Sequence, residues 1–85
     1  MGSYRIEVKR TAAKEIGDLP KADCRRVVAK IELLARDPRP HGAEKLSGAD
    51  KYRVRQGDYR ILYEIDDSAQ SVTIVKVGNR REIYR

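Results

Sequence analysis

The start of the chain alternates apolar and charged residues, a pattern typical of a β-strand with one buried face. Residues 4–9 follow this alternation, so we expect a strand there. Thr11 then offers an N-cap, and the good helix formers after it predict a short helix over residues 12–16. We expect Gly17 and Asp18 to end this helix.

A longer amphipathic helix is expected next. Pro20 suits its first turn, and apolar residues then follow the i, i+3, i+4, i+7 spacing of one helix face. Asp37 and Pro38 end the pattern, and residues 39–50 are predicted to form a polar loop punctuated by proline and glycine. The apolar face consists of Cys24, Val27, Val28, Ile31 and Leu34.

Beyond this loop the apolar period changes from helical to two, which is typical of strands. We expect strands at residues 51–56, 59–65 and 71–77, joined by turns at 56–58 and 66–70, with a bend at Gly78 and Asn79. The complete order predicts one small α+β domain over residues 1–85, arranged βααβββ. In it, two helices pack on one face of a twisted, largely antiparallel sheet.

Alternation along two of these strands predicts where three arginines lie. Tyr52 and Val54 share the apolar face of the first strand. Arg53 and Arg55 therefore point to the opposite face, where Arg60 of the partner strand joins them. Arginine suits a bidentate grip on phosphate oxygens. An antiparallel sheet also keeps one face solvated with charged residues, so a purely solvated face is the alternative.

Composition and charge narrow the class of protein. The chain has 85 residues, of which 40% are hydrophobic and 38% are charged, so it is apolar enough to fold and too charged for a membrane protein. Lysine and arginine number 19 against 13 acidic residues, which gives a net charge of +6. This excess favours an anionic partner such as nucleic acid, an acidic protein or a membrane surface, although net charge also serves solubility alone.

Several common classes of site lack a sequence signal. No apolar run approaches the ~18 residues of a transmembrane helix, and the first residues lack the apolar stretch of a signal peptide, so we expect a cytoplasmic protein without a membrane partner. The single cysteine, Cys24, and the single histidine, His41, supply no cluster of metal ligands. Gly-rich phosphate loops, HExxH and nucleophile elbows do not occur. We therefore expect neither a metal nor another cofactor.

The end of the sequence adds further basic and aromatic groups. Arg80, Arg81 and Tyr84 follow the last expected strand. A tail along the sheet edge would bring the phenol of Tyr84 near the arginines, whose positive charge would lower its pKa from about 10. Tyr84 is then a candidate general base, and a surface aromatic near a terminus is the simpler alternative.

Three segments together resemble a known family. They are KLSG at 45–48, YRVRQGDYRILYEI at 52–65 and VTIVKVGNRREIYR at 72–85, and they are similar to the RelE branch of the RelE/ParE toxin superfamily over almost the whole chain. The resemblance implies a RelE-like, microbial-RNase-like fold. It also implies a ribosome-dependent endoribonuclease that cuts mRNA in the decoding site and is held inactive by a co-expressed antitoxin. In the family the RNA's own 2′-hydroxyl is the nucleophile, a cyclic phosphate is left, and no metal is needed.

Roles for individual residues follow from the same resemblance. Tyr84 matches the C-terminal tyrosine proposed as general base. Arg60, in GDYR, matches an arginine that stabilises phosphate charge, and Arg80, in VGNR, matches one assigned to leaving-group protonation or phosphate contact. Arg53 and Arg55 match basic positions that are lysines in some relatives, and arginine is harder to deprotonate, which argues against proton transfer by these two. RNA-backbone contacts are implied for Lys45, Lys51 and Arg81.

Two other functions fit the same sequence. A ParE-like protein would bind and inhibit DNA gyrase without cutting nucleic acid, but that branch generally lacks the arginine and tyrosine set present in VGNRREIYR. A basic RNA-binding module without activity is the other alternative, and its affinity would fall steeply with salt.

Overall fold

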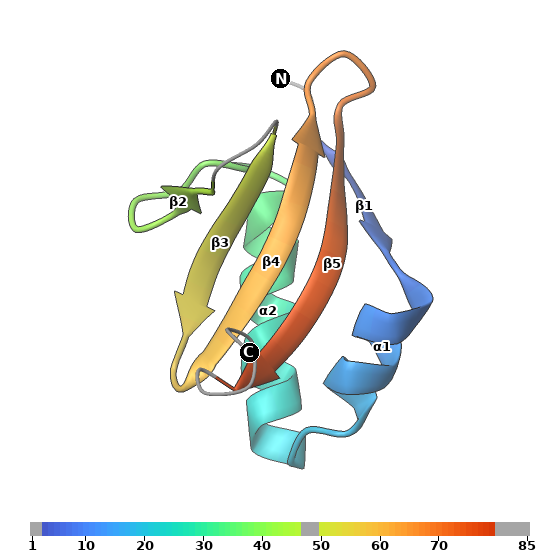
Figure 1. Ribbon diagram of the computed structural model, residues 1–85, viewed down its shortest axis with the longest axis vertical. Helices are drawn as coiled ribbons and strands as arrows, with labels where there is room; N and C mark the ends of the chain where they lie inside the picture. Colours follow the sequence, from blue (N-terminus) through green and yellow to red (C-terminus); the bar gives the residue numbers. More distant parts are fainter. Residues whose placement is uncertain (1–2, 47–49, 80–85) are drawn as a thin grey trace.

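The structure is a computed structural model, and it describes residues 3–46 and 50–79. These residues form a five-stranded sheet and two helices (Figure 1). The strands are β1 (Arg5–Val8), β2 (Glu44–Lys45), β3 (Lys51–Gln56), β4 (Tyr59–Asp66) and β5 (Ser71–Asn79), and the helices are α1 (Arg10–Gly17) and α2 (Lys21–Leu34). The predicted α+β class and the predicted order of helices and strands are therefore confirmed, with one short strand added.

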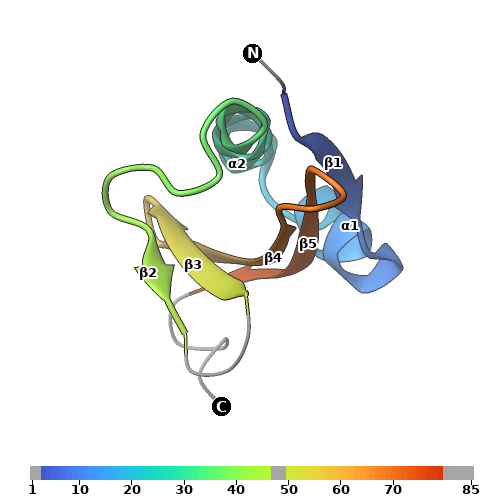
Figure 2. The ribbon, with the colours of Figure 1, turned by 90° about the horizontal axis from the view of Figure 1, so that it is seen from above.

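The sheet has the order β1-β5-β4-β3-β2. The first strand pairs with the last in parallel, and every other neighbouring pair is antiparallel. Seen from above, the sheet curves around α2 (Figure 2). Helix α1 lies where β1 ends, beside the second half of β5, and the Val77 amide donates a 3.0 Å hydrogen bond to the Glu15 carboxylate. Helix α1 thus covers the part of the β5 edge that β1 leaves open.

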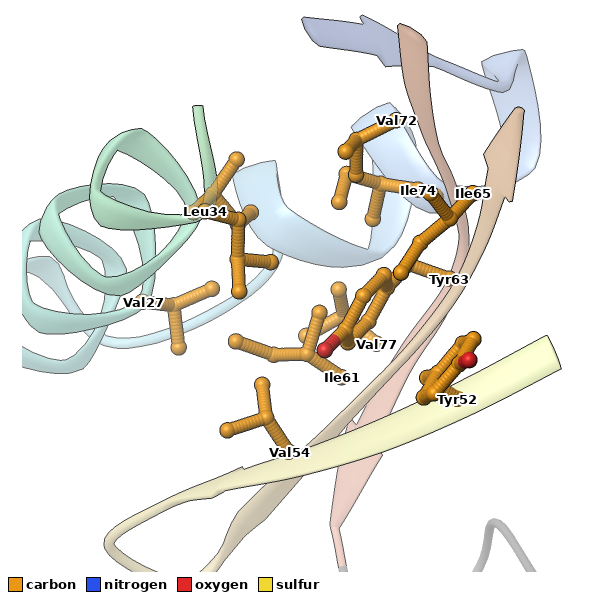
Figure 3. Packing of buried hydrophobic residues seen from close by; sticks show 12 residues of the cluster. Val27, Leu34, Tyr52, Val54, Ile61, Tyr63, Ile65, Val72, Ile74 and Val77 are labelled. Carbon is orange, nitrogen blue, oxygen red and sulfur yellow. The ribbon is translucent and has the colours of Figure 1, made fainter. Parts of the chain in front are cut away.

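The core lies between the helices and the inner face of the sheet (Figure 3). Val27, Ile31 and Leu34 are buried, as their helical spacing predicts, whereas Cys24 is only half-buried. Val28 is 39% exposed, so its placement on the apolar face was wrong; that face of α2 is narrower than the sequence pattern suggested. Burying each large aliphatic side chain contributes about 1.5–3 kcal/mol. The sheet supplies the other large buried side chains: Tyr52, Val54, Ile61, Tyr63, Ile65, Val72, Ile74 and Val77.

A register shift in the sheet lets β5 keep its apolar side chains inside. Leu62 pairs with Lys76, but Tyr63 pairs with Ile74, so Val75 is an extra residue on β5. Such a β-bulge bends its strand and increases the local twist. Without it, Ile74 and Val77 could not both face the core, because three positions along a regular strand reverse the side chain's direction.

Two further local expectations differ from the structure. The bend expected at Gly78 and Asn79 was wrong, because both residues continue β5 and pair with Arg60 and Tyr59 of β4. Glu44 and Lys45 form a short strand inside the expected loop. Within the described residues, no helix is long and apolar enough to cross a membrane.

Candidate functional site

The outer face of the sheet gathers the arginines of β3 and β4. Arg55 and Arg60 are direct cross-strand partners, and Arg53 stands two positions away from Arg55 along β3, on the same face. Together with Gly42 and Glu44 they line an open hollow of about 250 Å³. The convergence of Arg53, Arg55 and Arg60 that strand alternation predicts is therefore present.

These guanidinium groups differ in their freedom to move. Arg55 is exposed, whereas Arg60 is only 7% exposed, although alternation placed it on an uncovered face. Its strand is flanked on both sides, by β3 and β5, so its neighbours cover more of its side chain than they cover on a strand nearer the edge. A covered side chain has few rotamers available, so the Arg60 guanidinium is held in place before any ligand arrives.

Glu44 is a member of this site that the sequence pattern did not reveal. It stands opposite Arg53 in the β2–β3 register, and its carboxylate forms an ion pair with the Arg53 guanidinium. Among the described residues that line the hollow, Glu44 alone is acidic. A two-residue strand is too short to show a period, which is why this carboxylate was hidden in an apparent loop.

The other candidate residues do not all join the hollow. Lys45 pairs with Tyr52 and so lies on the opposite side of β2 from Glu44. Lys51 stands opposite Glu64, at the far end of β3, and lines a separate groove of about 640 Å³. That groove is bordered by more acidic than basic side chains, namely Arg5, Glu7, Asp50, Lys51, Glu64 and Asp66. The remaining candidates, Arg80, Arg81 and Tyr84, lie outside the described residues.

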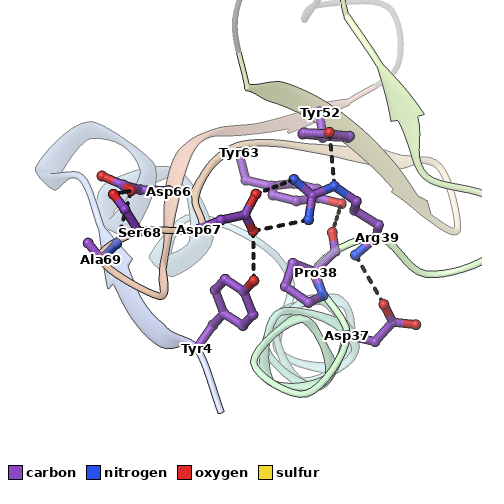
Figure 4. Close-up of polar contacts among 10 residues, drawn as sticks. All are labelled: Tyr4, Asp37, Pro38, Arg39, Tyr52, Tyr63, Asp66, Asp67, Ser68 and Ala69. Atoms are coloured by element: carbon purple, nitrogen blue, oxygen red, sulfur yellow. Dashed lines mark hydrogen bonds and ion pairs between the residues drawn. The ribbon is translucent and has the colours of Figure 1, made fainter. Parts of the chain in front are cut away.

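The loop that leads into β2 is held by a polar network (Figure 4). Arg39 donates to both carboxylate oxygens of Asp67, at 3.2 and 2.9 Å, and to the Tyr52 hydroxyl at 3.0 Å. Its guanidinium also lies over the Tyr52 ring, 5.2 Å from the centroid. Tyr4 donates to Asp67 at 2.6 Å, and Tyr63 donates to the Pro38 carbonyl at 2.7 Å. These bonds fix the segment that carries Gly42 and Glu44 to the hollow.

The network also shifts proton affinities. Hydrogen bonds from Arg39 and then Tyr4 hold the pKa of the Asp67 carboxyl below its usual value. The hydrogen bond to Asp67 raises the pKa of Tyr4. Burial, followed by the nearby Tyr52, raises the pKa of Tyr63 to about 12. Tyr63 therefore remains a neutral, packed phenol at physiological pH, as its inward position predicts.

The described part of the site has donor groups that suit an anion. Three guanidinium groups offer forked donors that match the oxygens of a phosphate. The residues predicted to move protons, Arg80 and Tyr84, belong to the segment that is not described. Across residues 3–46 and 50–79, no group of three or more His, Cys, Asp or Glu side chains lies close enough to hold a metal ion.

Comparison with known proteins identifies the family. Residues 6–84 match the model of the ParE toxin of type II toxin–antitoxin systems. Toxin RelG of Mycobacterium tuberculosis is 34% identical, with 96% of this chain and 97% of RelG covered. The putative toxin RelE1 of Methanocaldococcus jannaschii is 28% identical, with 96% of each chain covered.

Solved structures agree with this assignment. A RelE–RelB complex from Pyrococcus horikoshii contains a chain with a TM-score of 0.84 and 31% identity, covering 94% of this chain and 98% of that one. The isolated RelE toxin of Escherichia coli gives a TM-score of 0.80 at 26% identity, with 96% and 92% covered. The chain therefore belongs to the ParE toxin family of type II toxin–antitoxin systems, and its similarity to RelG and RelE proteins makes it a RelE-family toxin.

Proposed function

We propose that this toxin is an endoribonuclease that cuts mRNA in the ribosomal decoding site. The observation that carries the proposal is the hollow in which Arg53, Arg55 and Arg60 converge on the outer face of the sheet. Attack on a phosphodiester adds negative charge to the non-bridging oxygens, and guanidinium groups already in place stabilise that charge more than the ground state. Removing one such donor commonly lowers the rate by ~10²–10³.

The proposed reaction uses the RNA's own 2′-hydroxyl. Its oxygen forms a bond to phosphorus while the bond from phosphorus to the 5′-oxygen breaks, leaving a 2′,3′-cyclic phosphate and a 5′-hydroxyl. Tyr84 takes the proton from the 2′-hydroxyl, and Arg80 contacts the phosphate or supplies the proton that the 5′-oxygen needs. Arg53, Arg55 and Arg60 hold the phosphate and remain charged throughout.

An open hollow of about 250 Å³ cannot enclose an RNA chain or align its 2′-hydroxyl by itself. Correct positioning lowers a barrier by roughly 7–11 kcal/mol in the best cases. We therefore assign this task to the ribosome, with mRNA as the substrate and the cytoplasm as the place of action. The outer face of the sheet would then turn toward the decoding site.

An antitoxin is the second partner in this proposal. The toxin from P. horikoshii was solved as a RelE–RelB complex, which supports an antitoxin for this chain as well. A net charge of +6 favours an antitoxin with acidic segments, and an amphipathic or strand-forming segment would suit the sheet and its edges.

A reconstituted translation system tests the proposal. The wild-type protein should cut ribosome-bound message, whereas Tyr84→Phe and Arg80→Ala should cut it at least 100-fold more slowly, by analogy with the loss of a single transition-state donor (~10²–10³). Arg25→Gln, on the exposed surface of α2, is the control and should cut like the wild type. Equal cutting by all four proteins would refute the assigned roles of Tyr84 and Arg80.

Gyrase inhibition is the second candidate, because the matched family model is that of a ParE toxin. A supercoiling assay with the same preparation separates the two functions. Inhibition of supercoiling together with intact mRNA in the translation system would replace the nuclease proposal with a ParE-like one.

A further inference from the structure

Glu44 places a negative charge inside a hollow whose other charged lining residues, among those described, are arginines. Its carboxylate pairs with Arg53 across the β2–β3 register, and Arg55 and Arg60 stand directly opposite each other on β3 and β4. Like charges directly opposite in a sheet repel each other. The negative charge of Glu44 lowers the positive potential of the hollow. Its ion pair with Arg53 also occupies guanidinium donors that a phosphate would use.

The two members of this pair differ in mobility. The Arg53 side chain is 19% exposed, whereas that of Glu44 is 60% exposed. A largely exposed glutamate rotates into solvent at little cost, since a surface ion pair contributes little net stability. When a phosphate arrives at Arg53, Glu44 is thus the partner that leaves.

We propose that Glu44 is an internal competitor for RNA phosphate at Arg53, a residue that weakens the toxin's affinity for free RNA. The inference rests on the proposed function in taking RNA as the ligand. RNA held by the ribosome has a high effective concentration at the site and displaces the carboxylate, whereas dilute free RNA does so less often. Glu44 in this way favours ribosome-bound substrate.

A binding titration tests the proposal without any cleavage step. The probe is a fluorescent single-stranded 2′-O-methyl RNA, which lacks the nucleophilic hydroxyl, titrated with protein at several salt concentrations. Glu44→Gln should bind about two- to fivefold more tightly, the range expected for a partly exposed ion pair. Its log–log salt slope should steepen by about 0.7, the value for one additional phosphate contact on a single strand.

Two further variants separate local competition from general charge. Glu64→Gln removes the same charge from the same sheet face but away from the hollow, and its salt slope should match that of the wild type. In an Arg53→Gln background, the Glu44→Gln gain should disappear, since the contested donor is gone. Glu44→Thr, a good strand former, should reproduce the gain if the glutamine variant folds poorly.

The proposal is overturned if Glu44→Gln binds no better than the wild type, if Glu64→Gln gains as much, or if the gain survives without Arg53. A loss of ribosomal cleavage of 100-fold or more in Glu44→Gln would instead make Glu44 a proton-transfer group and would also overturn it. Failure of the nuclease proposal is recognised separately, because wild-type protein would then leave mRNA intact whatever the binding titration shows.

Discussion

At the residue scale, Tyr63 shows how a polar group is accommodated in a small core. Its ring is buried and stacks on Tyr52 with centroids 5.9 Å apart, while its hydroxyl reaches the Pro38 carbonyl. Strand alternation was sufficient to predict the inward ring. It could not predict the hydrogen bond, because that bond joins residues 25 positions apart through the path of the loop.

Tyr63→Phe should lower the free energy of unfolding by about 1–3 kcal/mol at pH 7, because the Pro38 carbonyl loses its partner. The pKa of Tyr63 is raised to about 12 in the folded state, so its contribution is complete below pH ~10 and is lost as the pH rises toward 12. Urea unfolding at pH 7 and pH 11 should therefore show that the free energy of unfolding falls less between these two pH values for the variant than for the wild type. An alkaline loss equal to that of the wild type would contradict this account.

At the scale of elements, the loop after α2 and the turn between β4 and β5 are joined by Arg39 and Asp67. The sequence places Asp66 and Asp67 in the turn predicted at residues 66–70, where their side chains are expected to stabilise the turn. Asp66 does so, accepting hydrogen bonds from Ser68 and Ala69, but Asp67 also accepts hydrogen bonds from Tyr4, just before β1, and from Arg39 of the loop. Turn propensity depends only on residues that are close together in the sequence. The contact between Arg39 and Asp67 instead depends on how the loop crosses the inner side of the sheet.

Asp67→Asn should lower the thermal midpoint at pH 7, because the amide cannot replace the charged acceptor of Arg39 and Tyr4. The pKa of Asp67 is lowered by folding, so its stabilisation is present above the ordinary value of about 3.9 and is lost as the pH falls through the folded-state pKa. The difference in thermal midpoint between the variant and the wild type should shrink at pH 3 and below. Asp58→Asn, in the β3–β4 turn, is the control, and a gap that is independent of pH would refute the link.

The sheet itself was predictable in most of its parts. Alternation in Tyr52–Arg55 and around Leu62 located the arginine face correctly, because the side-chain period of a strand is two. Strand β2 was missed because two residues are too few to show an alternating pattern. The bulge at Val75 was missed because it interrupts the alternation of its strand. Both depend on pairing between strands, which no local window of sequence contains.

At the scale of the whole molecule, the net charge of +6 is not spread evenly over the outer face. The arginine hollow lies at the end near the β3–β4 turn, and the groove bordered by Glu7, Asp50 and Glu64 lies at the other. Composition alone could not reveal this division. Under the proposed action on the ribosome, RNA phosphates would therefore be expected at the arginine end.

The central claim is that the arginine hollow stabilises the phosphate during cleavage of ribosome-bound mRNA. Its most direct test is the single-turnover cleavage rate of one mRNA on the ribosome by the wild type, Arg60→Gln and the exposed-surface control Arg25→Gln, with folding checked by circular dichroism. We predict a loss of about 10²–10³ for Arg60→Gln and an unchanged rate for Arg25→Gln. A folded Arg60→Gln protein that cuts as fast as the wild type would contradict the account.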